Sequence, residues 1–188
     1  FNDCFASQCT PLVNGSVLPH IQYHTNSRIG SFEITTTEIN DVLQRLNAKK
    51  AHGPDNLSTN MIKLCGDHLS VPWKIIFDNI LETGIFPDVW KEANVTPVHK
   101  KKDKQIITNY RPISLLPILA KVYERILFIK LYNHLNSNNL ITKNQSGFIP
   151  RDSCTNQLLA LVHEIHAAFD DKNCLEVRAA FLDMSKAF

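Results

Sequence analysis

The chain has 188 residues, of which 44% are hydrophobic and 20% are charged, and its net charge is +2 at neutral pH. This length is enough to bury one core or two small ones. No uninterrupted apolar run reaches the roughly 18 residues that a membrane span needs, and the first residues lack the layout of a secretory signal. The five cysteines show no paired CxxC spacing. This pattern excludes a disulfide framework or zinc module and favours an intracellular location, in the nucleus or the cytoplasm.

Positive charge is concentrated in the middle of the chain. Residues 91–130 contain nine Lys or Arg side chains and three acids, a net +6, in a chain whose total is +2. Such a cluster is typical of a surface that binds phosphates, and equally of a solvated, lysine-rich hairpin tip. The charge count by itself leaves both interpretations open.

The first predicted element is a polar, turn-rich arm at residues 1–31, which we expect to be a linker or a disordered segment. A helix follows, because Thr35 and Glu38 have capping-box spacing and the next apolar residues share one face. Gly84 suits the end of the last helix in this part of the chain. Three helices are predicted here: one that starts at Thr35 and ends before residues 51–56, one over 58–69 and one over 72–83.

The second half of the chain combines strands with helices. A very polar stretch separates two segments of β-compatible residues, which predicts a hairpin with a long charged tip. The predicted elements are strands over 93–98 and 111–116, a helix that includes 119–133, a loop over 136–147, a helix over 155–170 and a buried strand over 175–183. The predicted fold class is therefore α+β and rich in helix.

Asp183 stands directly after the apolar residues 179–182, at the end of the predicted strand. A carboxylate at the end of a buried strand is costly unless it holds a cation or joins a hydrogen-bond network. Taken alone, an Asp in this place is more often a turn or cap residue. The neighbouring motifs favour the cation.

Five motifs occur along the chain in a fixed order: GPD (53–55), the spaced Trp90, Ala93, Pro97 and Lys100, NYRPISLL (109–116), QSGFIPRDS (145–153) and FLDMSKAF (181–188). Together they resemble the reverse transcriptases of non-LTR (LINE-type, jockey-like) retrotransposons. The resemblance implies that residues 32–188 are an incomplete reverse transcriptase domain, truncated after the fingers and the first palm strand of a right-hand polymerase. The chain departs from the family at several positions: Asn56 replaces a Gly, and Ile149, Arg151, Asp152 and Cys154 differ from the usual QxGFRxGxST pattern.

The resemblance also implies a reaction. The family consists of RNA-directed DNA polymerases, which use an RNA template, a DNA primer and deoxynucleoside triphosphates. Two divalent cations, Mg²⁺ or alternatively Mn²⁺, promote nucleotidyl transfer to the primer 3′-OH in the complete enzyme. On the family's motif, Asp183 is a catalytic residue and a metal ligand.

Further site residues are carried over from the same motifs. The cations that reach the triphosphate fall on Lys100 and Arg111, with Lys101 and Lys102 as alternatives for the lysine. Phe188 takes the place of the bulky residue that screens the sugar 2′ position. The residues nearest the template and nucleotide fall on Gln145, Gly147 and Phe148.

The family's second catalytic element, a Tyr/Phe-x-Asp-Asp hairpin, has no counterpart in the sequence, because Asp170-Asp171 ends a predicted helix. With one family carboxylate, this chain is expected to be inactive by itself. Two other hypotheses remain: a non-catalytic nucleic-acid-binding module and a decayed retroelement fragment. No membrane partner is expected, and the sequence does not indicate an oligomeric state.

Overall fold

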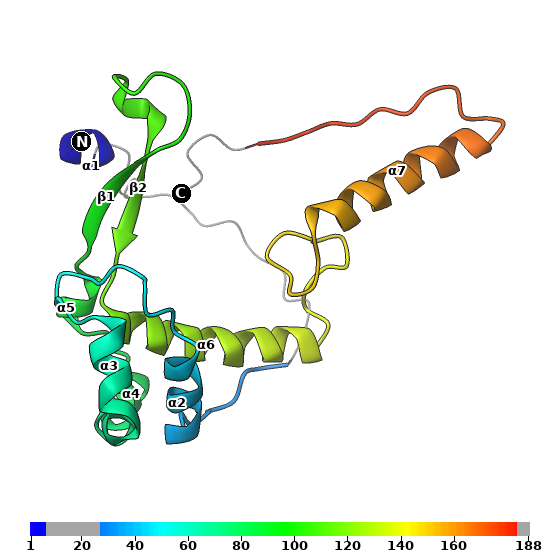
Figure 1. Cartoon of the computed structure of the whole chain (residues 1–188). Helices are drawn as coiled ribbons and strands as arrows, with labels where there is room; N and C mark the ends of the chain where they lie inside the picture. The colour runs from blue at the N-terminus through cyan, green and yellow to red at the C-terminus, as the bar shows by residue number, and fades with distance from the viewer. Residues whose placement is uncertain (7–26, 184–188) are drawn as a thin grey trace, which may run out of the picture. The chain divides into compact units, whose positions relative to one another are not determined.

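Helices dominate the computed structural model, which describes residues 1–6 and 27–183 and contains one two-stranded sheet within these ranges (Figure 1). The chain divides into two compact units, Phe1–Ser137 and Asn138–Phe188. The predicted α+β, helix-rich class is confirmed. No helix in the described ranges is both long and apolar enough to cross a lipid bilayer. The elements are α1 (Asn2–Ala6), α2 (Thr36–Gln44), α3 (Thr59–Cys65), the 3-10 turn η1 (Gly66–Leu69), α4 (Ser70–Thr83), α5 (Asp88–Lys91), β1 (Asn94–His99), the 3-10 turn η2 (Ile107–Asn109), β2 (Tyr110–Leu115), α6 (Ile118–Ser137) and α7 (Cys154–Asp170).

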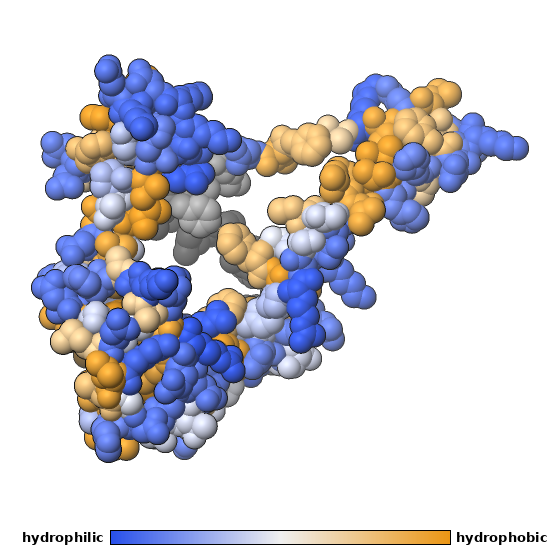
Figure 2. Space-filling view, in the orientation of Figure 1, coloured by the Kyte–Doolittle hydropathy of each residue, from blue (hydrophilic) through white to orange (hydrophobic). Residues whose placement is uncertain are grey.

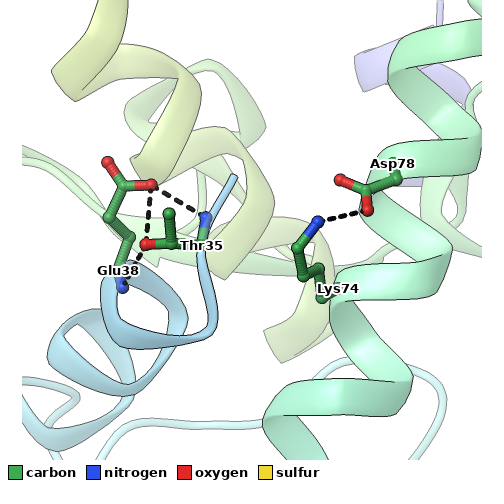
Figure 3. Close-up of polar contacts among 4 residues, drawn as sticks. All are labelled: Thr35, Glu38, Lys74 and Asp78. Carbon is green, nitrogen blue, oxygen red and sulfur yellow. Dashed lines mark hydrogen bonds and ion pairs between the residues drawn. The ribbon is translucent and has the colours of Figure 1, made fainter. Parts of the chain in front are cut away.

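The capping box predicted for the first long helix is present at the start of α2 (Figure 3). Glu38 N donates to Thr35 Oγ1 at 3.2 Å, and Thr35 N donates to one carboxylate oxygen of Glu38 at 3.0 Å. The other carboxylate oxygen lies 2.5 Å from Nζ of Lys130 on α6. Burial would raise the pKa of Glu38, but hydrogen bonds from Lys130 and Thr35 and the charge of Lys130 outweigh it and lower that pKa. One side chain therefore caps α2 and links it to α6.

The Glu38–Lys130 pair gives the fold a specific pH dependence. Because the folded-state pKa of Glu38 is lowered, the pair stabilises the fold above the ordinary pKa of about 4.5 and is lost as the pH falls below it. Lys130→Met is expected to cost about 0.2–1 kcal/mol at pH 7, as for other solvent-accessible ion pairs, and little at about pH 3. Urea unfolding at both pH values measures the difference. Lys121→Met, on the same helix but in none of the ion pairs of the described residues, is the control. If Lys130→Met lowered the free energy of unfolding equally at both pH values, the stabilisation would not come from its ion pair with ionised Glu38.

The next two predicted helices are present with shifted boundaries. Ser58 Oγ accepts from Met61 N at 3.2 Å and caps α3, after which the chain tightens into η1. The third predicted helix, α4, begins two residues before Pro72, which lies in the first turn, where its missing N–H has no helical partner to lose. Gly84 ends α4 in a left-handed conformation with φ of 67°, as predicted.

The core of the first unit lies between α2, α3, α4, α5 and α6. Trp73, Phe77 and Ile80 repeat at helical spacing and form the buried face of α4. The Phe77 ring lies 5.1 Å from that of Tyr123 and 6.1 Å from that of Trp90, between centroids. Burial raises the pKa of the Tyr123 hydroxyl. The buried apolar side chains are Ile34, Ile39, Val42, Leu43, Ile62, Trp73, Phe77, Ile80, Trp90, Ile118, Ala120, Val122, Tyr123 and Ile126.

Candidate functional site

The predicted hairpin is present, and each strand lies one residue away from its predicted bounds. Lys100 N donates to Asn109 O at 2.8 Å, which makes them a hydrogen-bonded pair, and such pairs alternate along an antiparallel ladder. Pro97 and Pro112 face each other and therefore occupy a non-hydrogen-bonded pair. No N–H is needed for the ladder at such positions, so both strands accommodate proline.

The register places Lys100 and Arg111 on one face of the hairpin. Arg111 pairs with Val98, and side chains two residues apart point to the same side of a strand. Lys100 is thus a diagonal neighbour of Arg111, a relation in which residues are about 7–8 Å apart. Both residues are exposed, and neither takes part in an ion pair of the described residues. Two cations arranged in this way can bind an anion with several charged oxygens.

The hairpin tip is ordered by polar side chains other than its lysines. Asp103 accepts from Gln105 N at 2.9 Å, Asn109 Nδ2 donates to Asp103 O at 2.8 Å, and the Tyr110 hydroxyl donates to Lys104 O at 2.9 Å. The Asp103 carboxylate, which is the acid of the tip, therefore accepts a main-chain hydrogen bond. Figure 2 shows the tip as a hydrophilic surface. Its lysines are exposed and lie outside the ion pairs of the described residues: Lys100, Lys101, Lys102 and Lys104.

The second unit brings Gln145, Gly147 and Phe148 together in one loop. Gln145 Nε2 donates to Gly147 O at 3.2 Å, so this amide stabilises the loop itself. Phe148 has a positive φ of 62° and is 95% exposed. Gly147 and Phe148 line a pocket of about 590 Å³ together with residues from the first turns of α7.

A carboxylate lies at the N-terminus of α7. Ser153 caps the helix by accepting from Asn156 N at 3.2 Å, and Asp152 accepts from Ser153 N at 2.7 Å. Hydrogen bonds from the Ser146 side chain, the Ser153 backbone and the Asn156 side chain lower the pKa of Asp152. The Asp152 carboxylate therefore lies near the partial positive charge of the α7 N-terminus. Without this carboxylate, the same charge would favour a bound phosphate. Asp152, which departs from the family pattern, therefore adds a negative charge to this loop at the start of α7.

The buried strand predicted over residues 175–183 is wrong. These residues form neither strand nor helix, and Leu175, Phe181 and Leu182 are 95%, 85% and 97% exposed. A strand needs a partner for its backbone N–H and C=O groups, and within residues 27–183 the two strands pair with each other. The helix predicted before this segment is confirmed as α7, but it buries no residue. Figure 2 shows apolar side chains at the surface of this unit.

Asp183, the predicted metal ligand, is exposed at the end of this irregular segment. Residues 1–6 and 27–183 contain no group of three or more His, Cys, Asp or Glu side chains that could hold a metal ion. Two-metal chemistry needs several carboxylates around the ions. The described residues thus do not fit a two-metal centre, and no reaction step is assigned to one. Phe188, predicted to screen the sugar, lies outside the described residues.

One contact between two motifs was not predicted. Gly53 of the GPD motif lies against the peptide that joins Leu116 to Pro117, immediately after β2. The residues are more than 60 positions apart in the sequence, and local patterns carry no signal for such a contact. The one indication in the sequence was that Gly53 and Leu116 both belong to motifs of the ordered set.

Known relatives align with most of the chain. The RNA-directed DNA polymerase from mobile element jockey of Drosophila melanogaster is 33% identical over 156 residues, 82% of this chain and 17% of that protein. The probable RNA-directed DNA polymerase from transposon BS of the same species is also 33% identical over 156 residues, 82% of this chain and 17% of that protein. The jockey polymerase of Drosophila funebris is 30% identical over 156 residues, again 82% of this chain and 17% of the relative. No protein-family model matches the chain. The chain thus spans 17% of the length of these relatives.

Proposed function

We propose that this chain, which belongs to the family of non-LTR retrotransposon reverse transcriptases, forms the part of an RNA-directed DNA polymerase that binds the incoming deoxynucleoside triphosphate. The first unit then corresponds to the fingers, and residues 175–183 correspond to the start of the palm. An RNA template and a DNA primer are the further partners that the family implies. The observation that carries the proposal is the common face of Lys100 and Arg111 on the hairpin.

The chemistry of this face suits a triphosphate. Arg111 offers a planar fork of donors that can bind two phosphate oxygens at once, whereas Lys100 is a compact point charge. Cations held in place offset the charge on the β- and γ-phosphates during phosphoryl transfer. The register also separates the candidate lysines. Lys100 continues the face of Arg111, while Lys101 and Lys102 belong to the tip, so we assign the lysine role to Lys100.

The other site residues are proposed on weaker support. Gln145, Gly147 and Phe148 are assigned to the surface beside the template and nucleotide, and their common loop and its pocket support this. Asp183 is assigned as one carboxylate ligand for Mg²⁺, with Mn²⁺ as the alternative, in the complete polymerase. Phe188 is assigned to the sugar 2′ position on the motif alone.

Binding assays on residues 1–188 test the hairpin assignment. A fluorescent deoxynucleoside triphosphate and a single-stranded RNA are titrated at several salt concentrations. Arg111→Ala is expected to weaken binding and to reduce the slope of log K against log salt by about one, because one phosphate contact is lost. Lys100→Ala is expected to have a similar effect, and Lys101→Ala a smaller one.

Arg45→Ala is the matched control, since Arg45 is an exposed arginine at the end of α2. It should leave both the affinity and the salt slope as in the unmodified chain. An unchanged slope for Arg111→Ala would overturn the assignment of the hairpin. A loss for RNA with no loss for the triphosphate would favour a nucleic-acid-binding module instead.

A further inference from the structure

Residues 53–56, the GPDN turn, form a turn held by its own hydrogen bonds. Asn56 N donates to Gly53 O at 3.2 Å, and Leu57 N donates to Asp55 Oδ1 at 3.3 Å. Pro54 restricts φ at the second position of the turn. Asn56 has a positive φ of 56°, a conformation that Asn tolerates better than most residues. The GPDN turn is therefore stiff, although it belongs to no helix or strand.

Gly53 lies directly against the connection between β2 and α6. A Cβ at position 53 would lie 2.5 Å from Pro117 N and 2.6 Å from the carbonyl carbon of Leu116. Both contacts are with main-chain atoms, so no side-chain rotation could relieve them. Gly53 and Pro117 are both buried. This approach of two backbones therefore requires glycine.

The orientation of the hairpin depends on its base. β1 and β2 contact each other extensively, and neither strand has more than marginal contact with a helix. Figure 1 shows the two strands extending away from helices α2 to α6. The hairpin joins those helices through residues 92–93 before β1 and residues 116–117 after β2. The GPDN turn lies against the second of these connections.

We propose that Gly53 is a positioning residue: through its contact with Leu116–Pro117 it fixes the inclination of the hairpin on the helices, and with it the location of Lys100 and Arg111. The identity of the anion that these cations bind rests on the proposed function. The inclination itself is a property of this chain without any ligand.

The geometry gives the size of the effect. A carbon at position 53 would have to retreat from 2.5 Å to an ordinary contact of about 3.5 Å, so the connection after β2 must move by about 1 Å. Paired strands are about 4.8 Å apart, and strands of six residues reach about 20 Å. A displacement of about 1 Å at one strand base therefore moves the hairpin tip by about 4 Å.

Pulsed electron paramagnetic resonance on residues 1–188 tests this inference. Native cysteines are replaced by serine, and spin labels are attached at Gln105→Cys in the hairpin tip and Glu124→Cys on α6. Gly53→Ala is expected to shift or broaden the label distance by about 4 Å. A second pair, Asp41→Cys with Glu124→Cys, joins α2 to α6 and reports on the helices alone.

Gly30→Ala is the matched control, because an added Cβ there has nothing within 4 Å. It should leave both distances unchanged. A change in Gly53→Ala that is confined to the tip pair supports the positioning role. An unchanged tip pair, or an equal change in both pairs, overturns it.

A second variant covers the case in which Gly53→Ala does not fold. Asn56→Val strains the GPDN turn at its positive φ without adding an atom at position 53. The tip distance should broaden in Asn56→Val and stay as in the unmodified chain in Asn56→Gly. Equal tip distances in these two variants would overturn the inference. The label distances are measured without nucleotide. If Arg111→Ala leaves triphosphate binding unchanged, that result therefore contradicts the proposed function and not the role of Gly53.

Discussion

Phe77→Ala is expected to lower the free energy of unfolding by about 3–5 kcal/mol. Phe77 is completely buried, and its ring packs against those of Tyr123 and Trp90. Removing the ring leaves a cavity between α4, α5 and α6, which close-packed neighbours fill only in part. Urea unfolding followed by tryptophan fluorescence measures the loss, since the buried Trp73 and Trp90 lie in the same core.

Phe181→Ala is the matched control for this prediction. Phe181 is 85% exposed, so the same deletion should change the free energy of unfolding by no more than about 0.5 kcal/mol. A loss for Phe77→Ala as small as that for Phe181→Ala would mean that the aromatic cluster does not form the core of the first unit.

No primer extension is expected from residues 1–188 alone, with either Mg²⁺ or Mn²⁺. An in-line transfer needs two ions held between attacking and leaving oxygens, and carboxylates must hold them. Asp183 is the one residue of this sequence that we propose as a carboxylate ligand for these ions, and the described residues contain no group of three metal-binding side chains. Extension of a labelled DNA primer on an RNA template measures the activity.

A complete jockey-type polymerase in the same assay is the positive control. Triphosphate binding by residues 1–188, measured in parallel, separates a missing metal centre from a misfolded chain. Clear DNA synthesis by residues 1–188 would contradict the proposal that Asp183 is the one carboxylate in this chain that binds the catalytic metal ions.

Local sequence rules predicted most of the secondary structure. The capping box of Thr35 and Glu38, the helix end at Gly84 and the polar tip between two β-compatible segments all appear as expected. These features depend on interactions within a few residues, which a short stretch of sequence contains in full. Some helix boundaries moved: α4 begins two residues before its predicted start, and α3 ends four residues before its predicted end because the chain tightens there into η1.

Burial was predicted less well. The sequence predicted a helix over 155–170 and a buried strand over 175–183. The helix is present as α7 but buries no residue, and residues 175–183 form no strand and expose Leu175, Phe181 and Leu182. Periodicity reports what a segment could bury, whereas burial also requires a second surface placed against it. For residues 175–183 the missing partner also removes the strand itself, because an unpaired backbone has no ladder to join.

The sequence alone predicted the long helices, the hairpin, its charge and the ordered motifs that resemble the family. It did not predict the short helices α1 and α5, and α1 lies in the arm that was expected to be a linker or disordered. The sequence left Lys100, Lys101 and Lys102 as alternatives for the lysine role, and it did not reveal that Glu38 meets Lys130 or that Gly53 contacts Leu116–Pro117. The tertiary structure showed both contacts, because packing brings these distant residues together. Its strand register places Lys100 on the face of Arg111, which supports the proposal that Lys100 has the lysine role. The physical reason is that such contacts depend on how separate elements meet, which no local stretch of sequence specifies.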